Sequence, residues 1–361
     1  MIPIAKPYFG DEEKNAVMNV LDSGMIASGS VVDEFQSEFA SYVGVEHGAA
    51  ASNGTTALEI LLRASGIKKG DKIITTPFSF IASTNCIIYV GAIPVFVDID
   101  PVTFNISPDL VEKILKNDPD IKAILIVHLF GHPCDMDEFI KLSKKYNVLL
   151  FEDCAQSHGA LYKGKMTGSF GDASAFSFYP TKNMTTSEGG MIVSDNNEII
   201  EKARLLINHG MSVRYYHDEI GYNYRMTNIA AAIGLCQLKK LDSFNKKRNE
   251  IAKYYNKNIT NSLISKPSKI GNIYHCYHQY SILISEEKRD LFIKHMQQHN
   301  IGCAIFYPLS IPEQKCYKKF NFEKNYPITN QIKSQIVSIP IHPQLINFEL
   351  ENVTNVINNF I

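Results

Sequence analysis

The sequence has little net charge, few cysteines and no long hydrophobic run, and each shortage excludes a class of protein. The formal net charge is −1 over 361 residues, so there is no basic excess of the kind that nucleic-acid binding uses. No apolar run approaches the ~20 residues of a membrane-spanning helix, and the N-terminus has no signal-peptide pattern. We therefore expect a cytoplasmic protein with no nucleic-acid or membrane partner.

The cysteines are odd in number and scattered. No two of the seven stand at Cys-x-x-Cys spacing, which argues against a disulfide framework and against a zinc site. We expect free thiols in a reducing compartment and no bound metal. The residues are Cys86, Cys134, Cys154, Cys236, Cys276, Cys303 and Cys316.

Length and apolar content predict two domains. The 361 residues exceed one compact core, and a hydrophobic content of 45% supports a full globular fold. Strand-like runs alternate with helical patterns, and several of the runs are too apolar to expose either face to solvent. This predicts an α/β fold with a largely parallel sheet covered by helices on both sides. The expected strands are 73–76, 94–98, 123–127, 148–151, 175–179 and 191–193.

We place the domain boundary near residue 245, after an Ala-rich helical segment that leads into a charged helical stretch, 245–255. Residues 1–245 form the expected large domain. Residues 246–361 form a smaller C-terminal α+β domain, with a strand at 279–284 and helices around 289–299 and 349–360.

Lys182 is the first candidate catalytic residue. It is the only lysine in a small, polar segment, 174–191, that lies between two apolar runs. An amine that attacks an aldehyde needs a rigid position at a strand end and neighbours that bind the rest of the cofactor, here pyridoxal phosphate. Most lysines are only solvated, so the interpretation depends on other segments.

Two further segments support a cofactor site. Residues 52–62 read as a capped helix N-terminus, whose free N–H groups suit a phosphate, with the Thr55 and Thr56 hydroxyls as extra donors. The apolar run 148–151 ends in Glu152 and Asp153, and ligands of open α/β sheets gather at the carboxyl ends of strands. A carboxylate there can hold a pyridine nitrogen protonated. Taken singly, each pattern is also an ordinary helix cap or a solvated acid.

These segments, in this order, resemble the DegT/DnrJ/StrS family of pyridoxal phosphate-dependent sugar aminotransferases, which have fold type I, that of aspartate aminotransferase. The resemblance covers nearly the whole chain and implies a large domain with a mostly parallel mixed sheet. The matching motifs are Ile4-Ala5-Lys6-Pro7, Gly54-Thr55, Glu152-Asp153-Cys154-Ala155-Gln156, Pro180-Thr181-Lys182-Asn183 and Ile339-Pro340-Ile341-His342-Pro343.

The resemblance implies the catalytic roles. Lys182 is the lysine that bonds to the cofactor, Asp153 pairs with the pyridine nitrogen, and Gln156 contacts the ring hydroxyl. Family members with histidine in place of the lysine resemble dehydratases, so Lys182 favours transamination. The expected donor is glutamate, which leaves as 2-oxoglutarate. Lys182 then moves protons as general base and acid, with a pKa lowered by burial and by the cationic ring.

The resemblance also implies how the rest of the cofactor is held. Thr55, Thr56 and Ser177 bind the phosphate, and Phe80 matches the position of an aromatic ring that stacks on the cofactor. Asn223 matches a phosphate ligand donated by the neighbouring subunit. A homodimer with shared active sites is therefore expected.

Loop residues favour one position on the sugar. Thr181, Glu188, Tyr222 and Tyr224 match the pattern of family members that act at C4. We therefore expect amination of a nucleotide-linked 4-keto-6-deoxyhexose in amino-sugar biosynthesis, serving surface glycan or lipopolysaccharide assembly. Amination at C3 is the alternative, because a few loop residues can reorient a sugar.

The substrate side of the site departs from the family pattern. Many relatives have a histidine where this chain has Pro312, five residues after Tyr307. Tyr307, Arg214 and His217 are candidate substrate contacts. Arg214 and His217 could meet a pyrophosphate, or could equally be exposed loop residues.

Two rival functions can be weighed from the sequence. Residues 159–165 satisfy Gly-x4-Gly-Lys, but Met166 replaces the Ser or Thr that binds Mg²⁺ and the run does not directly follow the strand, so we expect a hairpin or a surface turn. A non-catalytic regulatory or binding protein of this fold is the other rival. The joint presence of Lys182, Asp153 and Gln156 argues against it.

Overall fold

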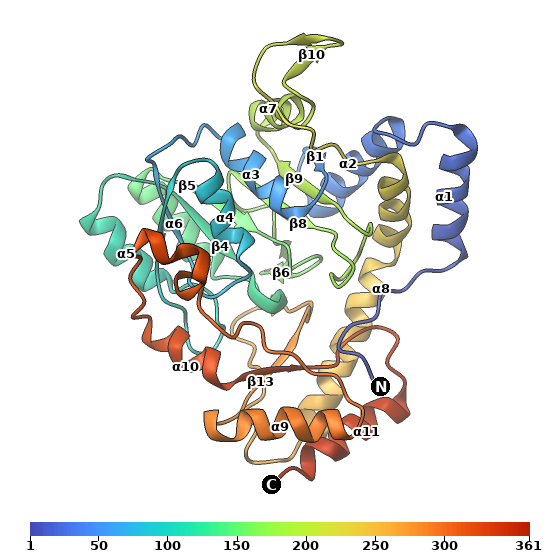
Figure 1. Ribbon diagram of the computed structural model, residues 1–361, viewed down its shortest axis with the longest axis vertical. Helices are drawn as coiled ribbons and strands as arrows, with labels where there is room; N and C mark the ends of the chain where they lie inside the picture. Colours follow the sequence, from blue (N-terminus) through green and yellow to red (C-terminus); the bar gives the residue numbers. More distant parts are fainter.

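A seven-stranded sheet forms the centre of the large domain (Figure 1), in a computed structural model that describes all 361 residues. Its strand order is β1-β9-β8-β5-β4-β2-β3. The five strands from β8 to β3 are parallel, whereas β9 is antiparallel to both of its neighbours. The bounds are β1 (His47–Ala51), β2 (Lys72–Thr75), β3 (Ile93–Phe96), β4 (Ile121–Val127), β5 (Leu149–Asp153), β8 (Ala173–Ser177) and β9 (Gly190–Ser194).

The predicted mostly parallel sheet is confirmed, and each of the six expected strands overlaps one of its strands. Strand β1 was missed because its sequence, His-Gly-Ala-Ala-Ala, has none of the β-branched or aromatic residues that mark strands. It forms because its pairing with β9 and its burial outweigh that weak local preference.

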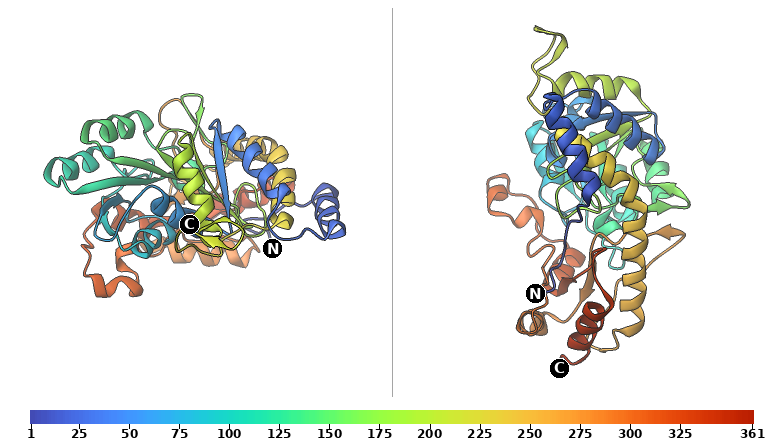
Figure 2. Two further views of the ribbon diagram at one scale, coloured as in Figure 1. Left: turned by 90° about the horizontal axis from the view of Figure 1, so that it is seen from above. Right: turned by 90° about the vertical axis from the view of Figure 1, so that its right-hand side faces the viewer.

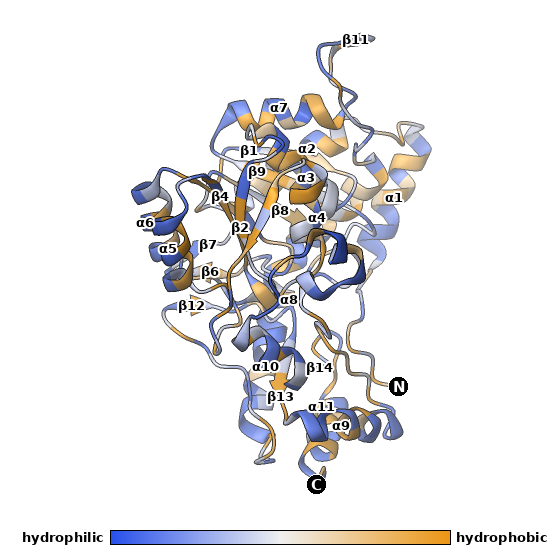
Figure 3. Cartoon of the chain, turned by 60° about the vertical axis from the view of Figure 1, so that its left-hand side comes forward, coloured by the Kyte–Doolittle hydropathy of each residue, from blue (hydrophilic) through white to orange (hydrophobic).

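Helices cover both faces of the sheet (Figures 1 and 2), and the sequence of β4 shows why. Ala123 and Leu125 are buried in one hydrophobic cluster, whereas Ile124 and Ile126 are buried in another, on the opposite face. In Figure 3, α5 and α6 carry hydrophilic residues on their outer sides. The helices of this domain are α1 (Asp11–Ser23), α2 (Ser30–Val43), α3 (Gly54–Ala64), α4 (Ala82–Tyr89), α5 (Pro108–Asn117), α6 (Met136–Tyr146) and α7 (Asn197–Ile207).

Helix α8 (Asn228–Asn258) continues without a break from the large domain into the C-terminal region (Figure 2). There Ile251 and Tyr255 join a second hydrophobic core with the antiparallel pair β13 (Tyr280–Leu283) and β14 (Ile336–Ile339). Ile2 packs into the same core and bridges Ile301, so the first residues belong spatially to this region. The division at residue 245 stays a prediction. The remaining helices are α9 (Glu286–Gln298), α10 (Pro327–Gln335) and α11 (Asn347–Asn358).

Short elements complete the fold. The expected hairpin at 159–165 is present as β6 (Leu161–Tyr162) and β7 (Lys165–Met166), paired with β12 (Ile273–Tyr274), and no helix follows it as a phosphate-binding loop would require. A second hairpin, β10 (Met211–Val213) and β11 (Tyr216–His217), projects from the body in Figure 1. Three 3-10 turns lie at η1 (Leu129–Gly131), η2 (Ile311–Glu313) and η3 (Lys315–Phe320).

No helix of the structure combines the length and the apolar character that crossing a membrane would require.

Gly234 on α8 gives a test of how α8 packs on α2. A Cβ added there would lie 2.6 Å from Cζ of the buried Phe35. Gly234→Ala would by itself favour the helix by roughly 1 kcal/mol, but overpacking a core costs about 1–3 kcal/mol. We expect a net loss in the free energy of unfolding, measured by urea denaturation of the cofactor-free protein.

The exposed Ser243→Ala on the same helix is the control for helix propensity, and it should be neutral or slightly stabilising. An increase in stability for Gly234→Ala would contradict the close contact between α2 and α8.

Candidate active site

Asp153 is fixed at the carboxyl end of β5. The buried carboxylate accepts hydrogen bonds from Ser83 Oγ at 2.7 Å and from the Ala155 backbone N–H at 3.1 Å. Burial raises the pKa of Asp153, and these two bonds oppose the rise. Ser83, on α4, was not predicted as a site residue. Nothing in the local sequence distinguishes it, because its role depends on the fold bringing α4 to the end of β5.

Gln156 is held by partners on both ends of its amide. Its Oε1 accepts from the Phe130 backbone N–H at 2.7 Å, and its Nε2 donates to the Tyr307 hydroxyl at 3.1 Å. The Tyr307 ring lies 6.3 Å from the ring of Phe80, which is 55% exposed. The structure therefore brings Gln156, Tyr307 and Phe80 to one place, with an aromatic face open to a ligand.

The N-terminus of α3 meets the end of β8. The contact requires glycine at position 54, because a Cβ there would lie 2.5 Å from Cβ of Ser177. Thr55, Thr56 and Ser177 therefore surround one helix N-terminus, which is a suitable anion site. Thr56 Oγ1 already donates to the Asn53 carbonyl at 2.9 Å, which leaves the hydroxyls of Thr55 and Ser177 as the free donors.

Lys182 lies in the loop that follows β8, where its backbone N–H donates to Tyr179 O at 2.9 Å. Its amine has no hydrogen-bond partner in the chain. Burial lowers the pKa of Lys182 to about 8, although the Asp153 carboxylate opposes that shift. An amine with such a pKa is partly unprotonated near neutral pH, as attack on a carbonyl requires.

The loop is anchored one residue further on. Asn183 is buried, and its Nδ2 donates to Asn245 Oδ1 on α8 at 2.8 Å and to Cys276 O at 3.0 Å. Asn245 in turn donates to His158 O at 2.8 Å. Two buried amides thus fix the loop of Lys182 against the helix that joins the two halves of the molecule.

Three of the predicted residues are not brought to this site within one chain. Asn223 is exposed, and Arg214 and His217 lie on the projecting β10–β11 hairpin (Figures 1 and 2). Arg214 contacts Tyr215, and His217 Nδ1 pairs with His209 O at 2.9 Å. None of the three contacts Lys182, Asp153 or Gln156 within the chain.

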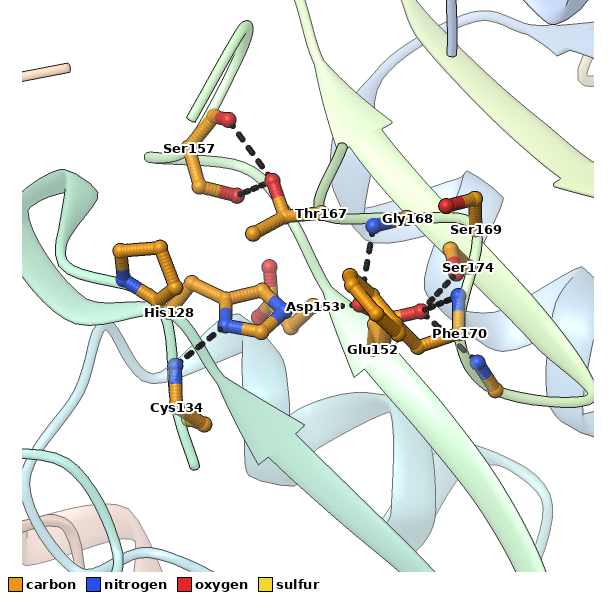
Figure 4. A network of polar contacts seen from close by, with 12 residues as sticks. His128, Cys134, Glu152, Asp153, Ser157, Thr167, Gly168, Ser169, Phe170 and Ser174 are labelled. Carbon is orange, nitrogen blue, oxygen red and sulfur yellow. Dashed lines mark hydrogen bonds and ion pairs between the residues drawn. The ribbon is translucent and has the colours of Figure 1, made fainter. Parts of the chain in front are cut away.

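A second buried polar cluster lies beside the site (Figure 4). His128, Glu152 and Cys154 have ligand atoms within 4.8 Å of one another, as a metal site would need. However, Glu152 accepts from five donors at 2.8–3.2 Å, namely His128, Gly168, Phe170, Gly171 and Ser174. Burial by itself would raise the pKa of Glu152, but these bonds outweigh it and the pKa is lowered. The carboxylate has no free acceptor site for a metal ion.

Comparisons with known proteins identify the relatives of this chain. Residues 7–360 match the profile of the DegT/DnrJ/EryC1/StrS aminotransferase family. The chain is 39% identical to the GDP-perosamine synthase of Escherichia coli O157:H7, covering 99% of this chain and 98% of that protein. It is 38% identical to the dTDP-3-amino-3,6-dideoxy-alpha-D-galactopyranose transaminase of Aneurinibacillus thermoaerophilus, covering 97% and 95%.

A solved structure agrees with these relatives. The PLP form of a Streptococcus pneumoniae protein assigned as a sugar aminotransferase superposes with a TM-score of 0.93 at 28% identity, covering 99% of this chain and 98% of that one. The fold is therefore the type I fold of pyridoxal phosphate enzymes, as the sequence predicted.

The Glu152 network predicts a structural role for that residue. In Glu152→Gln, either orientation of the amide turns an NH₂ group toward at least one backbone N–H, so a buried hydrogen bond is lost. We expect the free energy of unfolding to fall by roughly 1–3 kcal/mol. Dialysis against a chelator should leave the melting temperature of the wild-type protein unchanged. A lower melting temperature after dialysis, restored by one divalent metal, would contradict the assignment.

Proposed function

Because the chain belongs to the DegT/DnrJ/EryC1/StrS aminotransferase family, we propose that it transfers an amino group from glutamate to C4 of a nucleotide-linked 4-keto-6-deoxyhexose in amino-sugar biosynthesis. The family and the relatives identify the chain as a pyridoxal phosphate-dependent nucleotide-sugar aminotransferase. The single observation that carries catalysis is the placement of the Lys182 amine, which has no hydrogen-bond partner in the chain, on an anchored loop near the fixed carboxylate of Asp153.

The residues present fit the cofactor. The α3 N-terminus with Thr55, Thr56 and Ser177 suits its phosphate, and Asp153 and Gln156 suit the polar atoms of its ring. The exposed face of Phe80 suits ring stacking. Pyridoxal phosphate, when bound, supplies the electron sink for carbanion chemistry.

Lys182 has two tasks in this proposal. Its amine would hold the cofactor, and when free it would remove a proton from the substrate carbon and return one. A pKa of about 8 serves both tasks, because the amine gains and loses its proton near neutral pH. The bonds of Asn183 limit how far the loop can move between the two tasks.

The preference for C4 rests on Thr181, Glu188, Tyr222 and Tyr224. C3 is the second candidate, because the name of the Aneurinibacillus relative specifies a 3-amino sugar and the chain is 38% identical to it. Overall identity therefore does not separate the two positions. Glutamate as donor and a cytoplasmic location are part of the same proposal.

The geometry around Asn223 supports a shared site in a homodimer. Tyr222 and Tyr224 stack with ring centroids 5.0 Å apart and pack against the core. Residues on either side of an extended position point the opposite way, so Asn223 faces solvent, as its exposure shows. The Asn223 amide, held outward by the packed rings of Tyr222 and Tyr224, can reach the phosphate site of a second subunit.

Mixing two inactive variants tests the shared site. Lys182→Ala removes the reacting amine, and Asn223→Asp places a carboxylate against the partner's phosphate, so each homodimer should be inactive. After co-refolding at equal amounts we expect about one quarter of wild-type activity, since half of the dimers are mixed and each has one intact site. No recovery, although mass spectrometry detects mixed dimers, would contradict sharing. Lys68→Ala is the matched control for lysine loss, because Lys68 is exposed and forms no ion pair.

Product analysis tests the position of amination. With ¹⁵N-glutamate and nucleotide-linked 4-keto-6-deoxyglucose, we expect ¹⁵N bonded to C4 of the sugar in the NMR spectrum, and no transfer by Lys182→Ala. Turnover only with a 3-keto isomer, with ¹⁵N on C3, would replace the C4 proposal with the C3 one while leaving transamination intact.

A further inference from the structure

A cavity beside Lys182 contains positive charge without a compensating acid. It lies between the N-terminal segment, the loop of Lys182, helix α8 and Pro343. Its volume of ≈ 20 Å³ holds about one water-sized group. The lining residues that matter here are Lys6, Thr181, Lys182, Gln237 and Arg248, and no Asp or Glu is among the lining residues.

Arg248 on α8 is the buried wall of this cavity. Its side chain is 4% exposed, and Nη1 donates to the carbonyls of Ile341 at 2.7 Å and Tyr277 at 3.1 Å. Nε is buried without a partner, and no carboxylate lies within ion-pair distance of the guanidinium. Burial lowers the pKa of Arg248 to about 10, and the Cys276 thiol, not a carboxylate, opposes that shift. The guanidinium of Arg248 is therefore stabilised by carbonyl groups and not by a carboxylate. Buried charges in proteins are normally paired with an opposite charge.

Two lysines add to the positive potential. Lys6 lines the cavity from the N-terminal segment and forms no ion pair, and Lys182 lines it from the loop after β8. The acid that acts on Lys182 is Asp153, which lies outside this cavity.

Lys182 and Arg248 both disfavour the charged forms of the buried His158 and His278. The pKa of His342 is lowered by burial, by Arg248 and by Lys6, and the Glu349 carboxylate opposes that shift. The carboxylate of Glu13 accepts a hydrogen bond from the lining Gln237 at 2.8 Å but is already paired with Lys240. No acid lines the cavity itself.

We propose that this cavity is a binding subsite for one small anionic group, held by Arg248 and Lys6 beside Lys182. The group is a free halide ion or one carboxylate group of the amino donor. The carboxylate source rests on the proposed function, whereas the halide source requires only the cofactor-loaded protein. An anion here stabilises a positive charge on the nitrogen of Lys182, so its occupancy sets how readily that nitrogen gives up its proton.

The direct test is a chloride titration of the cofactor-loaded protein. The pH dependence of its visible absorption band gives the pKa of the nitrogen that links Lys182 to the cofactor. Replacing gluconate with chloride at constant ionic strength should raise that pKa saturably, by about 1 pH unit, which is the lower end of the effect of a close opposite charge. Constant ionic strength removes general screening.

Two variants locate the effect. Arg248→Gln should abolish the saturable shift of the pKa. Lys6→Ala should raise the dissociation constant for chloride by about 2- to 5-fold, as expected for the loss of an exposed charge. Lys68→Ala should leave it unchanged. Because Arg248 also bonds three carbonyls, Arg248→Gln could fail to fold, and Lys6→Ala then carries the test. No saturable shift in the wild type, or equal dissociation constants in wild type and Lys6→Ala, would overturn the proposal.

A competition experiment separates the two sources. Succinate, a dicarboxylate that cannot transaminate, is titrated at low and at saturating chloride and followed by the same band. If chloride weakens succinate binding in the wild type but not in Arg248→Gln, the occupant in turnover is the donor carboxylate. If the two bind independently while chloride still shifts the pKa, the occupant is the free ion. Failure of glutamate as donor would leave the chloride result intact, so the two proposals fail separately.

Discussion

The arrangement of the site depends on two consecutive carboxylates at the end of β5, Glu152 and Asp153. Alternation along a strand sends them to opposite faces of the sheet, and both are buried. Glu152 is saturated by donors from residues 168–174 and from His128, which fixes the connection between β5 and β8. Asp153 keeps acceptor capacity on the ligand side. One strand end thus supplies a structural anchor on one face and a functional group on the other.

The remaining parts of the site follow from that anchor. Once β8 is fixed beside β5, its end meets the N-terminus of α3 at Gly54, and the loop after it carries Lys182. The electrostatics are consistent across this region, because burial lowers the pKa of Lys182 and raises the pKa of Asp153. Burial thereby favours the neutral form of each group.

The sequence was sufficient for the parts of the molecule that local patterns determine. The apolar runs located the central strands, and the motifs around Lys182 and Asp153 gave the family and the fold. Ser83 and the Asn183–Asn245 pair were missed, because single polar residues acquire their roles only from contacts between distant segments. Strand β1 was missed for a different reason, since a short run of small residues carries no strand signal, although its partner β9 was predicted.

Helix α8 is a single rod of 31 residues, roughly 46 Å long at 1.5 Å per residue, and it passes from one half of the molecule to the other. Gly234 packs on α2 near its start, whereas Asn245 and Arg248 meet the loop and the cavity further along. The direction in which each of these side chains points is therefore set by its position along the helix, whatever residues lie between them. One inserted residue would rotate its second half by about 100° and turn both side chains away, so recombination between relatives must conserve the length of α8 even where its surface differs.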